Sequence, residues 1–319
     1  MPNPIIVNST YAGEFAGKYI APAVLAANTI AENAIDLMPN IAFQSPVRPM
    51  ILDDIVKDAT CDFTKVGDIT LNERMLTPKP MAVNLEFCKK TLFESWEAAQ
   101  MGYSQWKVIP KKFNDFLLGY VGASISEFVE QNIWDGTAGA DQFPGFYHIA
   151  SNDTDAISVT STATEVTADN VLEELGLIAS KISSKLYSNK SKKMYLSIPF
   201  ARAYVEALGG FAANGTGANG VDNKGTLWFN GQPLLFNGIP IHVANGLGSK
   251  GTTAVDKDRV MVSFRENFVF GTGLMSDLQK VQVLDMTPLD GSDNVRVIVK
   301  FSGGVQYGIS EDVIYYKHA

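Results

Sequence analysis

The feature that most constrains the fold is the order of two unlike segments, an extended hairpin followed by one long helix. Residues 47–92 hold short strand-like stretches separated by prolines, and their scattered charges leave no continuous apolar face. After Pro110, apolar residues recur at four-residue steps, which predicts an amphipathic helix over 111–134. An isolated hairpin is only marginally stable in water. We therefore expect other structure, such as another subunit, to hold the hairpin; a β-meander packed on its own domain is the alternative.

The long helix carries the strongest periodic pattern in the chain. Its apolar line is Phe113, Leu117, Val121, Ile125, Val129 and Ile133, and its polar side is Asn114, Asp115, Glu127, Glu130 and Gln131. Gly119 and Gly122 lower the intrinsic stability of the helix. We interpret them as positions where another backbone approaches closely.

The rest of the chain predicts helices and strands that end in a β-rich region. Residues 1–12 have no pattern and indicate an extended arm. Apolar spacing predicts one helix from Phe15 to Met38 and another over Thr167–Tyr187, with Thr167 as its N-cap. Further predicted elements are a helix at 199–208 and strands at 193–197, 226–229, 233–237, 239–243, 259–264, 281–286, 295–301 and 313–316.

The composition indicates a folded chain with an acidic surface. Of 319 residues, 46% are apolar and 19% charged, and the net charge is −8 with a pI near 5.0. This balance argues against a protein whose main task is to neutralise nucleic-acid phosphates. The N-terminus lacks the pattern of a secretory signal, and the apolar run Ile20–Ala27 is far short of the ~20 residues of a membrane span. We expect synthesis in a cytoplasm and no membrane contact.

The two cysteines, Cys61 and Cys88, are too few and too far apart for a disulfide framework or a zinc site. Two reduced thiols are the favoured interpretation. A hairpin folded about Arg74 and Met75 would instead place them nearly opposite each other.

No motif in the chain predicts catalysis, a cofactor or a metal. The sequence Gly215–Gly220 matches GxGxxG, but it follows a predicted helix and precedes a strand, the reverse of a dinucleotide site. Lys250-Gly251-Thr252 has the wrong order for a phosphate-binding loop.

Isolated polar residues add no site either. The histidines His148, His242 and His318 lack metal-ligand spacing, and we interpret His242 as structural. Asp153 and Asp155 are expected to be solvated loop acids, because they lack the ligand count that calcium requires. The lysines at 111–112 and 190–193 could contact phosphate, although Lys190 is also favourable near a helix C-terminus. We therefore predict no catalytic, cofactor-binding or metal-binding residues and no enzymatic activity.

The order of segments resembles the major capsid proteins of tailed bacteriophages, which share the Hong Kong 97-type α+β fold. The resemblance rests on the hairpin, the helix at 111–134, the turn sequences Asp135-Gly-Thr and Phe143-Pro-Gly-Phe146, and the strand pair in 232–244. It implies an N-terminal arm (1–46), an E-loop (47–88), a peripheral domain with its spine helix (89–150), an axial domain (151–294) and strands returning to the peripheral domain (295–319).

The resemblance also implies a function and partners. We expect a structural protein that forms pentamers and hexamers of an icosahedral shell around double-stranded DNA, with the E-loop and arm lying on neighbouring subunits. A separate scaffold, a portal, decoration proteins and weak, non-specific DNA contact are implied as partners, and the virion capsid, assembled in the host cytoplasm, as the location. Lys57, Lys65 and Lys79 are not predicted to form cross-links. The alternatives are an encapsulin-type nanocompartment around enzyme cargo and, less favoured, a nucleotide-binding enzyme with 209–225 as a lid.

Overall fold

A computed structural model describes residues 27–52, 56, 58, 69–71, 73–89, 111–161, 163–208, 234–273 and 281–318. Several sequence predictions lie outside these residues: the arm at 1–12, the start of the first helix, Cys61, the 215–220 motif and the strand at 226–229. The chain forms two compact units. One contains residues 80–128 and 273–302, and the other contains 27–79, 129–272 and 303–319. The unit boundaries fall inside the long helix α2 (Lys111–Asp135) and inside the long strand β14 (Asn294–Tyr307).

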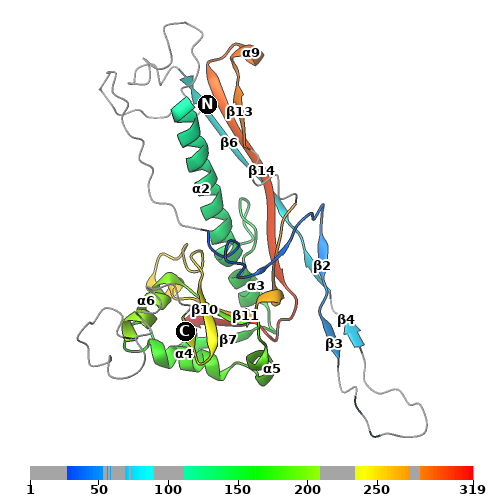
Figure 1. Ribbon diagram of the computed structural model, residues 1–319, viewed down its shortest axis with the longest axis vertical. Coiled ribbons are helices and arrows are strands. Elements are labelled where there is room, and N and C mark those ends of the chain that lie inside the picture. Colours follow the sequence, from blue (N-terminus) through cyan, green and yellow to red (C-terminus); the bar gives the residue numbers. More distant parts are fainter. Residues whose placement is uncertain are drawn as a thin grey trace. The chain divides into compact units, whose positions relative to one another are not determined.

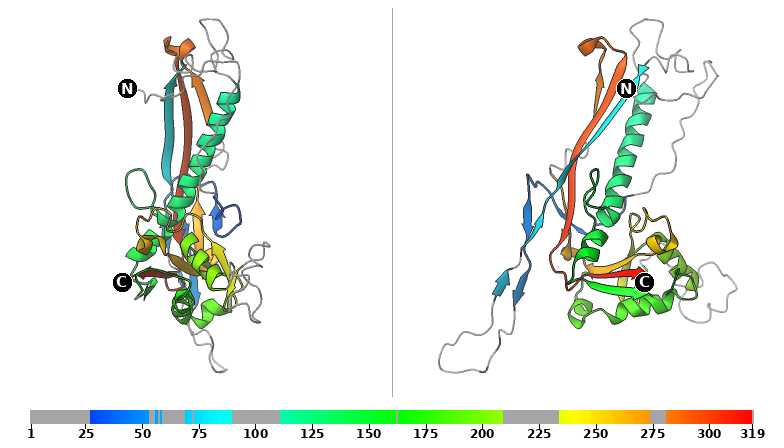
Figure 2. Two further views of the ribbon diagram at one scale, coloured as in Figure 1. Left: turned by 90° about the vertical axis from the view of Figure 1, so that its left-hand side faces the viewer. Right: turned by 180° about the vertical axis from the view of Figure 1, so that it is seen from behind.

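In the first unit, a sheet lies beside the first part of α2. Strand β14 pairs on one edge with β13 (Val281–Asp285) and on the other with β6 (Lys79–Cys88). Figure 2 shows the helix running alongside these strands. Alternate residues of β14, such as Val295, Val297 and Val299, are buried, as the period of two in a strand predicts. The short helix α9 (Thr287–Asp290) closes the β13–β14 hairpin, and Gly291 follows it with a φ of 75°.

The second unit is built around a six-stranded sheet with the order β7-β15-β11-β8-β10-β9. Its strands are β7 (Ile157–Ser161), β8 (Lys192–Leu196), β9 (Leu235–Phe236), β10 (Ile239–Val243), β11 (Val260–Phe264) and β15 (Ile314–His318). Strand β15, near the C-terminus, pairs parallel with β7 and antiparallel with β11, so it lies inside the sheet (Figure 1). The other strands of this unit are β1 (Asp36–Met38), β2 (Ser45–Val47), β3 (Met50–Leu52), β4 (Ile69–Leu71), β5 (Arg74–Leu76) and β12 (Phe268–Gly271).

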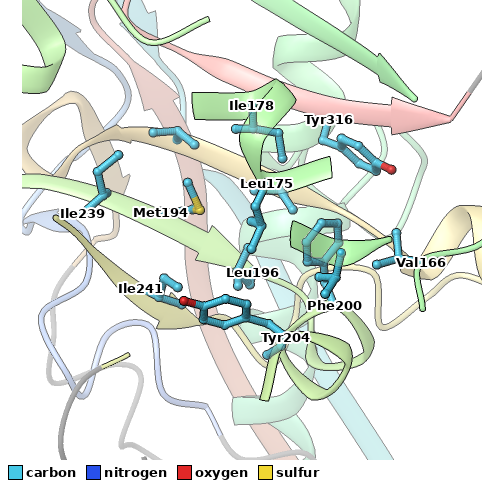
Figure 3. Packing of buried hydrophobic residues seen from close by; sticks show 14 of the residues in the cluster. Val166, Leu175, Ile178, Met194, Leu196, Phe200, Tyr204, Ile239, Ile241 and Tyr316 are labelled. Carbon is cyan, nitrogen blue, oxygen red and sulfur yellow. The ribbon is translucent and has the colours of Figure 1, made fainter. Parts of the chain in front are cut away.

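The main hydrophobic core of the second unit lies between this sheet and the helices α4 (Val171–Ser180), α5 (Ser184–Ser188) and α6 (Ile198–Ala207). The unit also contains α3 (Phe146–Asn152) and α8 (Ala254–Lys257). Figure 3 shows apolar side chains of α4 and α6 meeting those of the strands, including Leu175, Leu196 and Phe200, which are fully buried. The predicted helix at 199–208 and the strands at 193–197, 239–243, 259–264 and 313–316 correspond to α6, β8, β10, β11 and β15. These predictions are confirmed, and β8, β11 and β15 bury consecutive residues on both faces of the sheet.

Two helix predictions require correction, and the interpretation of Gly119 and Gly122 finds no matching contact among the described residues of this chain. The predicted helix to Met38 is wrong over residues 27–38, which form turns and then β1; Asn33 has a φ of 49°, outside the helical region. The helix predicted over 167–187 is two shorter helices, α4 and α5, with N-cap residues Asn170 and Ser183 instead of Thr167. A Cβ at Gly119 or Gly122 of α2 would meet nothing within 4 Å in this chain, so no backbone of the described residues approaches them closely.

Candidate functional site

The hairpin before α2 has one continuous antiparallel register. Ser45 pairs with Leu76 in β2–β5, and Leu52 pairs with Ile69 in β3–β4, so no residue is gained or lost between the two short sheets. Figure 1 shows β3 and β4 continuing the ribbon beyond β2 and β5. The ladder is interrupted at Pro49, which has no N–H to donate. Next to it, Arg48 Nε lies 2.8 Å from Glu73 Oε1, so an exposed ion pair joins the strands there.

This register corrects the predicted centre of the hairpin. Arg74 and Met75 lie in β5, paired with Val47 and Pro46, and not in the terminal turn. Because Arg74 pairs with Val47 inside a strand, a hairpin folded about Arg74 is ruled out. Cys61 itself lies outside the described residues. The sequence prediction failed because prolines and charges on both sides of the segment allow several registers.

Arg74 anchors the base of the hairpin to the second unit. Its Nη2 donates to Asp153 Oδ2 at 2.6 Å and also to Ser310 Oγ. Its guanidinium lies over the ring of Tyr307, 4.7 Å from the centroid. Since Asp153 follows α3 and Tyr307 ends β14, one side chain connects three elements that are distant in sequence. We call Arg74, Asp153, Tyr307 and Ser310 the hairpin anchor.

Asp153 is the electrostatic centre of the hairpin anchor. Tyr307 OH donates to its Oδ2 at 2.7 Å, Ser310 Oγ donates at 3.0 Å, and the Asp155 N–H donates to Oδ1 at 3.1 Å. Burial alone would raise the pKa of Asp153, but the hydrogen bonds from Tyr307, Asp155, Arg74 and Ser310 lower this pKa to about 2. The carboxylate is therefore ionised at neutral pH. The sequence interpretation of Asp153 as a solvated loop acid was wrong.

Lys79 makes a second attachment close to the hairpin base. Its ammonium donates to three backbone oxygens, those of Gly139 at 2.7 Å, Ala140 at 2.5 Å and Gln142 at 2.9 Å. These carbonyls belong to the turn that follows α2. The contacts use all three protons of the ammonium group.

A second anchor fixes the segment just before β1, where the expected arm joins the body. Thr29 donates to the carboxylate of Glu130 twice, from Oγ1 to Oε1 at 2.5 Å and from its N–H to Oε2 at 3.2 Å. Trp134 Nε1 donates to Thr29 Oγ1 at 2.8 Å. Thr29, Glu130 and Trp134 are all essentially buried. We call these three residues the arm anchor.

Glu130 is held through hydrogen bonds to its carboxylate and through close packing of its backbone. Burial raises its pKa, and hydrogen bonds from Thr29, Gly246 and Trp134 oppose this effect. A Cβ at Gly246 would lie 2.1 Å from the backbone oxygen of Glu130, so only glycine allows this approach. Sequence periodicity placed Glu130 on the polar side of the helix, and that prediction was wrong. The helix pattern contains no sign of a partner 101 residues away.

Further contacts bind residues 28–34 to the six-stranded sheet. Asn28 Nδ2 donates to Val243 O at 2.7 Å, and Tyr195 OH donates to Ala34 O at 2.6 Å. His242 Nδ1 lies 3.3 Å from Glu32 Oε2. Burial, and then the charge of Lys193, lower the pKa of His242 to about 4, so this histidine is neutral at pH 7. His242 is a buried structural residue, as the sequence predicted.

The remaining candidate residues are not brought together into one site. Lys250 Nζ donates to Asn132 Oδ1 at 2.9 Å and to Gln142 Oε1 at 3.0 Å, and so joins a loop to the end of α2. His318 Nδ1 lies 2.7 Å from Ala163 O. Among the described residues no cluster of His, Cys, Asp and Glu could hold a metal ion. Within the same residues, no helix is both long and apolar enough to cross a bilayer.

The hairpin anchor and the arm anchor thus attach two segments of the chain to the rest of the second unit. Each consists of several hydrogen bonds at the point of attachment. Neither pairs a nucleophile with a base in the way that catalysis requires.

Solved structures share this fold over almost their whole length. The similar chains include one from the capsid of a native GTA particle (TM-score 0.62, 12% identity, 96% of this chain and 94% of that chain). Another is from Gordonia phage Cozz (TM-score 0.59, 12% identity, 97% and 91%). A third is from the capsid of the Myoviridae phage XM1 (TM-score 0.57, 11% identity, 97% and 96%). No protein-family model matches the sequence, and no curated protein matches it. The α+β fold of tailed-phage capsid subunits, inferred from the order of segments, is therefore confirmed as the fold of this chain.

Proposed function

We propose that this chain is a structural capsid protein, whose copies form the pentamers and hexamers of an icosahedral shell around double-stranded DNA. The observation that carries the proposal is the full-length match to capsid chains, combined with a hairpin that Arg74 anchors near its base. In this proposal the hairpin and the N-terminal arm lie on neighbouring copies. Residues 89–150 and 295–319 form the peripheral domain, and 151–294 form the axial domain.

The two anchors support this function physically. A segment that binds a neighbour must leave its own subunit at a defined angle, because a loosely attached segment loses more conformational entropy on binding. Arg74 fixes the hairpin at β5, and Glu130 fixes the segment before β1. Beyond Pro49, β3 and β4 form a sheet only with each other among the described residues. A two-stranded ribbon needs further contacts for stability, and a second copy would provide them.

Electron microscopy of the purified protein tests the proposal directly. We expect closed particles of uniform diameter, and a sedimentation boundary far above that of a 34.6 kDa monomer. A protein that stays monomeric at high concentration, with and without a co-expressed scaffold, would contradict the proposal. The particle contents distinguish the proposed viral shell from the alternative. Packaged DNA supports a viral shell, whereas an enzyme cargo identifies an encapsulin-type compartment.

Removal of the ribbon tests the role of the hairpin. Replacing residues 50–71 by a short Gly-Ser turn leaves the β2–β5 base and the hairpin anchor in place. We expect a folded subunit, judged by circular dichroism, that no longer forms closed particles. Normal particles from this deletion would mean that the hairpin does not join neighbouring copies.

A further inference from the structure

One lysine of the second unit lies against the carbonyl group of a buried amide. Lys250 Nζ donates to Asn132 Oδ1 at 2.9 Å and to Gln142 Oε1 at 3.0 Å. The carbonyl carbon Cγ of Asn132 lies no more than about 4 Å from Nζ, because a C=O bond is about 1.2 Å long. Reacting atoms in a productive geometry are about 3–3.5 Å apart. A small rotation of either side chain therefore brings the amine within reach of this carbon.

Two other lysines lie against groups that cannot react in this way. Lys79 contacts backbone carbonyls, whose displacement would cut the chain. Lys89 contacts Asp285; burial alone would raise the pKa of this carboxyl, but hydrogen bonds from Lys89 and Thr287 lower the pKa, so the carboxylate is ionised and is a poor electrophile. Lys250 instead contacts neutral side-chain amides, whose nitrogen can leave as ammonia while the backbone stays intact.

Both reacting side chains are held by the structure around them. Asn132 is fully buried in the last turn of α2. Lys250 follows Gly248, which has a φ of 71°, and a Cβ at Gly248 would lie 2.3 Å from Lys257 O. Only glycine fits there, so the backbone that leads to Lys250 is fixed. A fixed pair of groups reacts far more readily than free reactants, and burial of the amide protects it from hydrolysis.

The charges near this pair favour loss of a proton from the amine, which must be neutral to attack. Burial lowers the pKa of Lys250, and the charge of Asp135 only partly opposes this effect. Burial also raises the pKa of Asp135, although Arg259 and nearby backbone N–H groups oppose the shift. The two pKa values are therefore closer than in water, and proton transfer from the ammonium group to a carboxylate is easier.

We propose that Lys250 and Asn132 form an isopeptide bond, which joins the loop after β10 to the end of α2 within one chain. Asp135 takes a proton from the ammonium group, and the neutral Nζ attacks Cγ of Asn132. The Nζ–Cγ bond forms, the Cγ–Nδ2 bond breaks, and the departing nitrogen takes up the protons that Nζ has lost. One ammonium group and one primary amide become one secondary amide and one ammonium ion, so no oxidant or other reactant is required.

Gln142 is the competing amide. Its Oε1 also accepts a hydrogen bond from the Thr137 N–H at 3.2 Å, and its side chain is only partly buried. Asn132 is buried completely, so we assign the bond to Asn132. The inference goes beyond the proposed function and does not depend on it, because both residues belong to one chain and the bond would form as each subunit folds.

Mass spectrometry of the intact, denatured chain tests the inference. Loss of one ammonia predicts a mass about 17 Da below that calculated from the sequence. Lys250→Arg should have its full calculated mass, because a guanidinium stays protonated and cannot attack. Lys257→Arg changes an exposed lysine of α8 and, as the matched control, should keep the deficit. A digest of the wild type should contain one branched peptide that joins Lys250 to Asn132, and this result does not require the variants to fold.

Three outcomes would overturn the inference. The full mass in the wild type, even after long incubation at about pH 9 to raise the fraction of neutral amine, would show an ordinary hydrogen bond. A deficit that persists in Lys250→Arg would show that ammonia is lost elsewhere in the chain. A branched peptide through Gln142 would show that the assigned amide is wrong. Because the mass is measured on single denatured chains, the result is independent of particle formation.

Discussion

The hairpin anchor and the arm anchor do the same task with opposite electrostatics. Around Asp153, a guanidinium and two hydroxyls stabilise a partly exposed carboxylate, and the pKa of that carboxyl falls to about 2. Around Glu130, the donors that the described residues supply to the buried carboxyl are neutral, and burial raises its pKa. Burial disfavours the charged form, whereas a nearby cation favours it. The comparison shows that one fold fixes two segments by different means, and that acid should act on the two anchors in opposite directions.

The largest effect is expected at the arm anchor. Replacing Glu130 by Ala leaves the Thr29 N–H and hydroxyl and the Gly246 N–H without their acceptor in a buried space. The desolvation cost of such groups predicts a loss of about 3 kcal/mol in the free energy of unfolding. Chemical denaturation of the purified subunit measures it.

Two further variants control for the loss of a charge. Glu173→Ala removes an exposed carboxylate from α4 and should change the unfolding free energy by less than about 0.5 kcal/mol. Glu130→Gln keeps an acceptor oxygen, so its loss of unfolding free energy should lie between those of Glu130→Ala and Glu173→Ala. Equal stability of Glu130→Ala and Glu173→Ala would refute the importance of the arm anchor.

A smaller effect is expected at the hairpin anchor. Arg74→Ala removes the ion pair but leaves Asp153 with Tyr307, Ser310 and the Asp155 N–H. We expect a loss of about 1–2 kcal/mol, together with faster proteolytic cleavage between residues 45 and 76. Arg74→Lys should restore part of the stability, because a lysine keeps the charge but not the planar fork. Unchanged cleavage in Arg74→Ala would mean that other contacts hold the base.

The two anchors should respond oppositely to pH. The pKa of Asp153 is lower in the folded protein than in the unfolded chain. Its contribution to the free energy of unfolding is therefore complete above the ordinary value of 3.8 and is lost as the pH falls towards about 2. The pKa of Glu130 is higher in the folded protein than in the unfolded chain. Its contribution to the free energy of unfolding is therefore greatest below the ordinary value of 4.5 and declines as the pH rises through the pKa of the folded protein.

Urea denaturation between pH 2 and 7 checks these directions. The stability difference between wild type and Asp153→Asn should shrink at low pH, and that between wild type and Glu130→Gln should grow. Parallel trends in the two variants would contradict the electrostatic contrast.

The smallest effect is expected at the ion pair beside Pro49. Arg48 and Glu73 have side chains more than half exposed, and exposed pairs contribute about 0–1 kcal/mol. Arg48→Ala should change the unfolding free energy by less than about 0.5 kcal/mol, and added salt should remove even this difference. A double-mutant cycle with Glu73→Ala measures the coupling. A coupling above 1.5 kcal/mol would show that this position stabilises the hairpin as strongly as Arg74.

Local patterns were sufficient where apolar residues of one element are buried by its neighbours. Helix α2, the strand β8 and the strand β15 followed directly from apolar runs and spacing, because many of these apolar residues are buried. The same reasoning failed for the helix predicted to reach Met38. Its alanine-rich pattern is helical, but residues 28–34 are bound through side chains to the sheet, and tertiary hydrogen bonds outweigh a weak intrinsic preference.

The sequence by itself determined the order of elements, the acidic surface and the resemblance to phage capsid subunits, because these depend on composition and on spacing along the chain. The tertiary structure alone decided the register of the hairpin and the partners of Arg74 and Glu130. Those partners lie 79 and 236 residues away for Arg74, and 101 for Glu130. A contact at such a distance leaves no periodic signal in the sequence. Its physical basis, the burial of a carboxylate beside matched donors, exists only once the chain has folded.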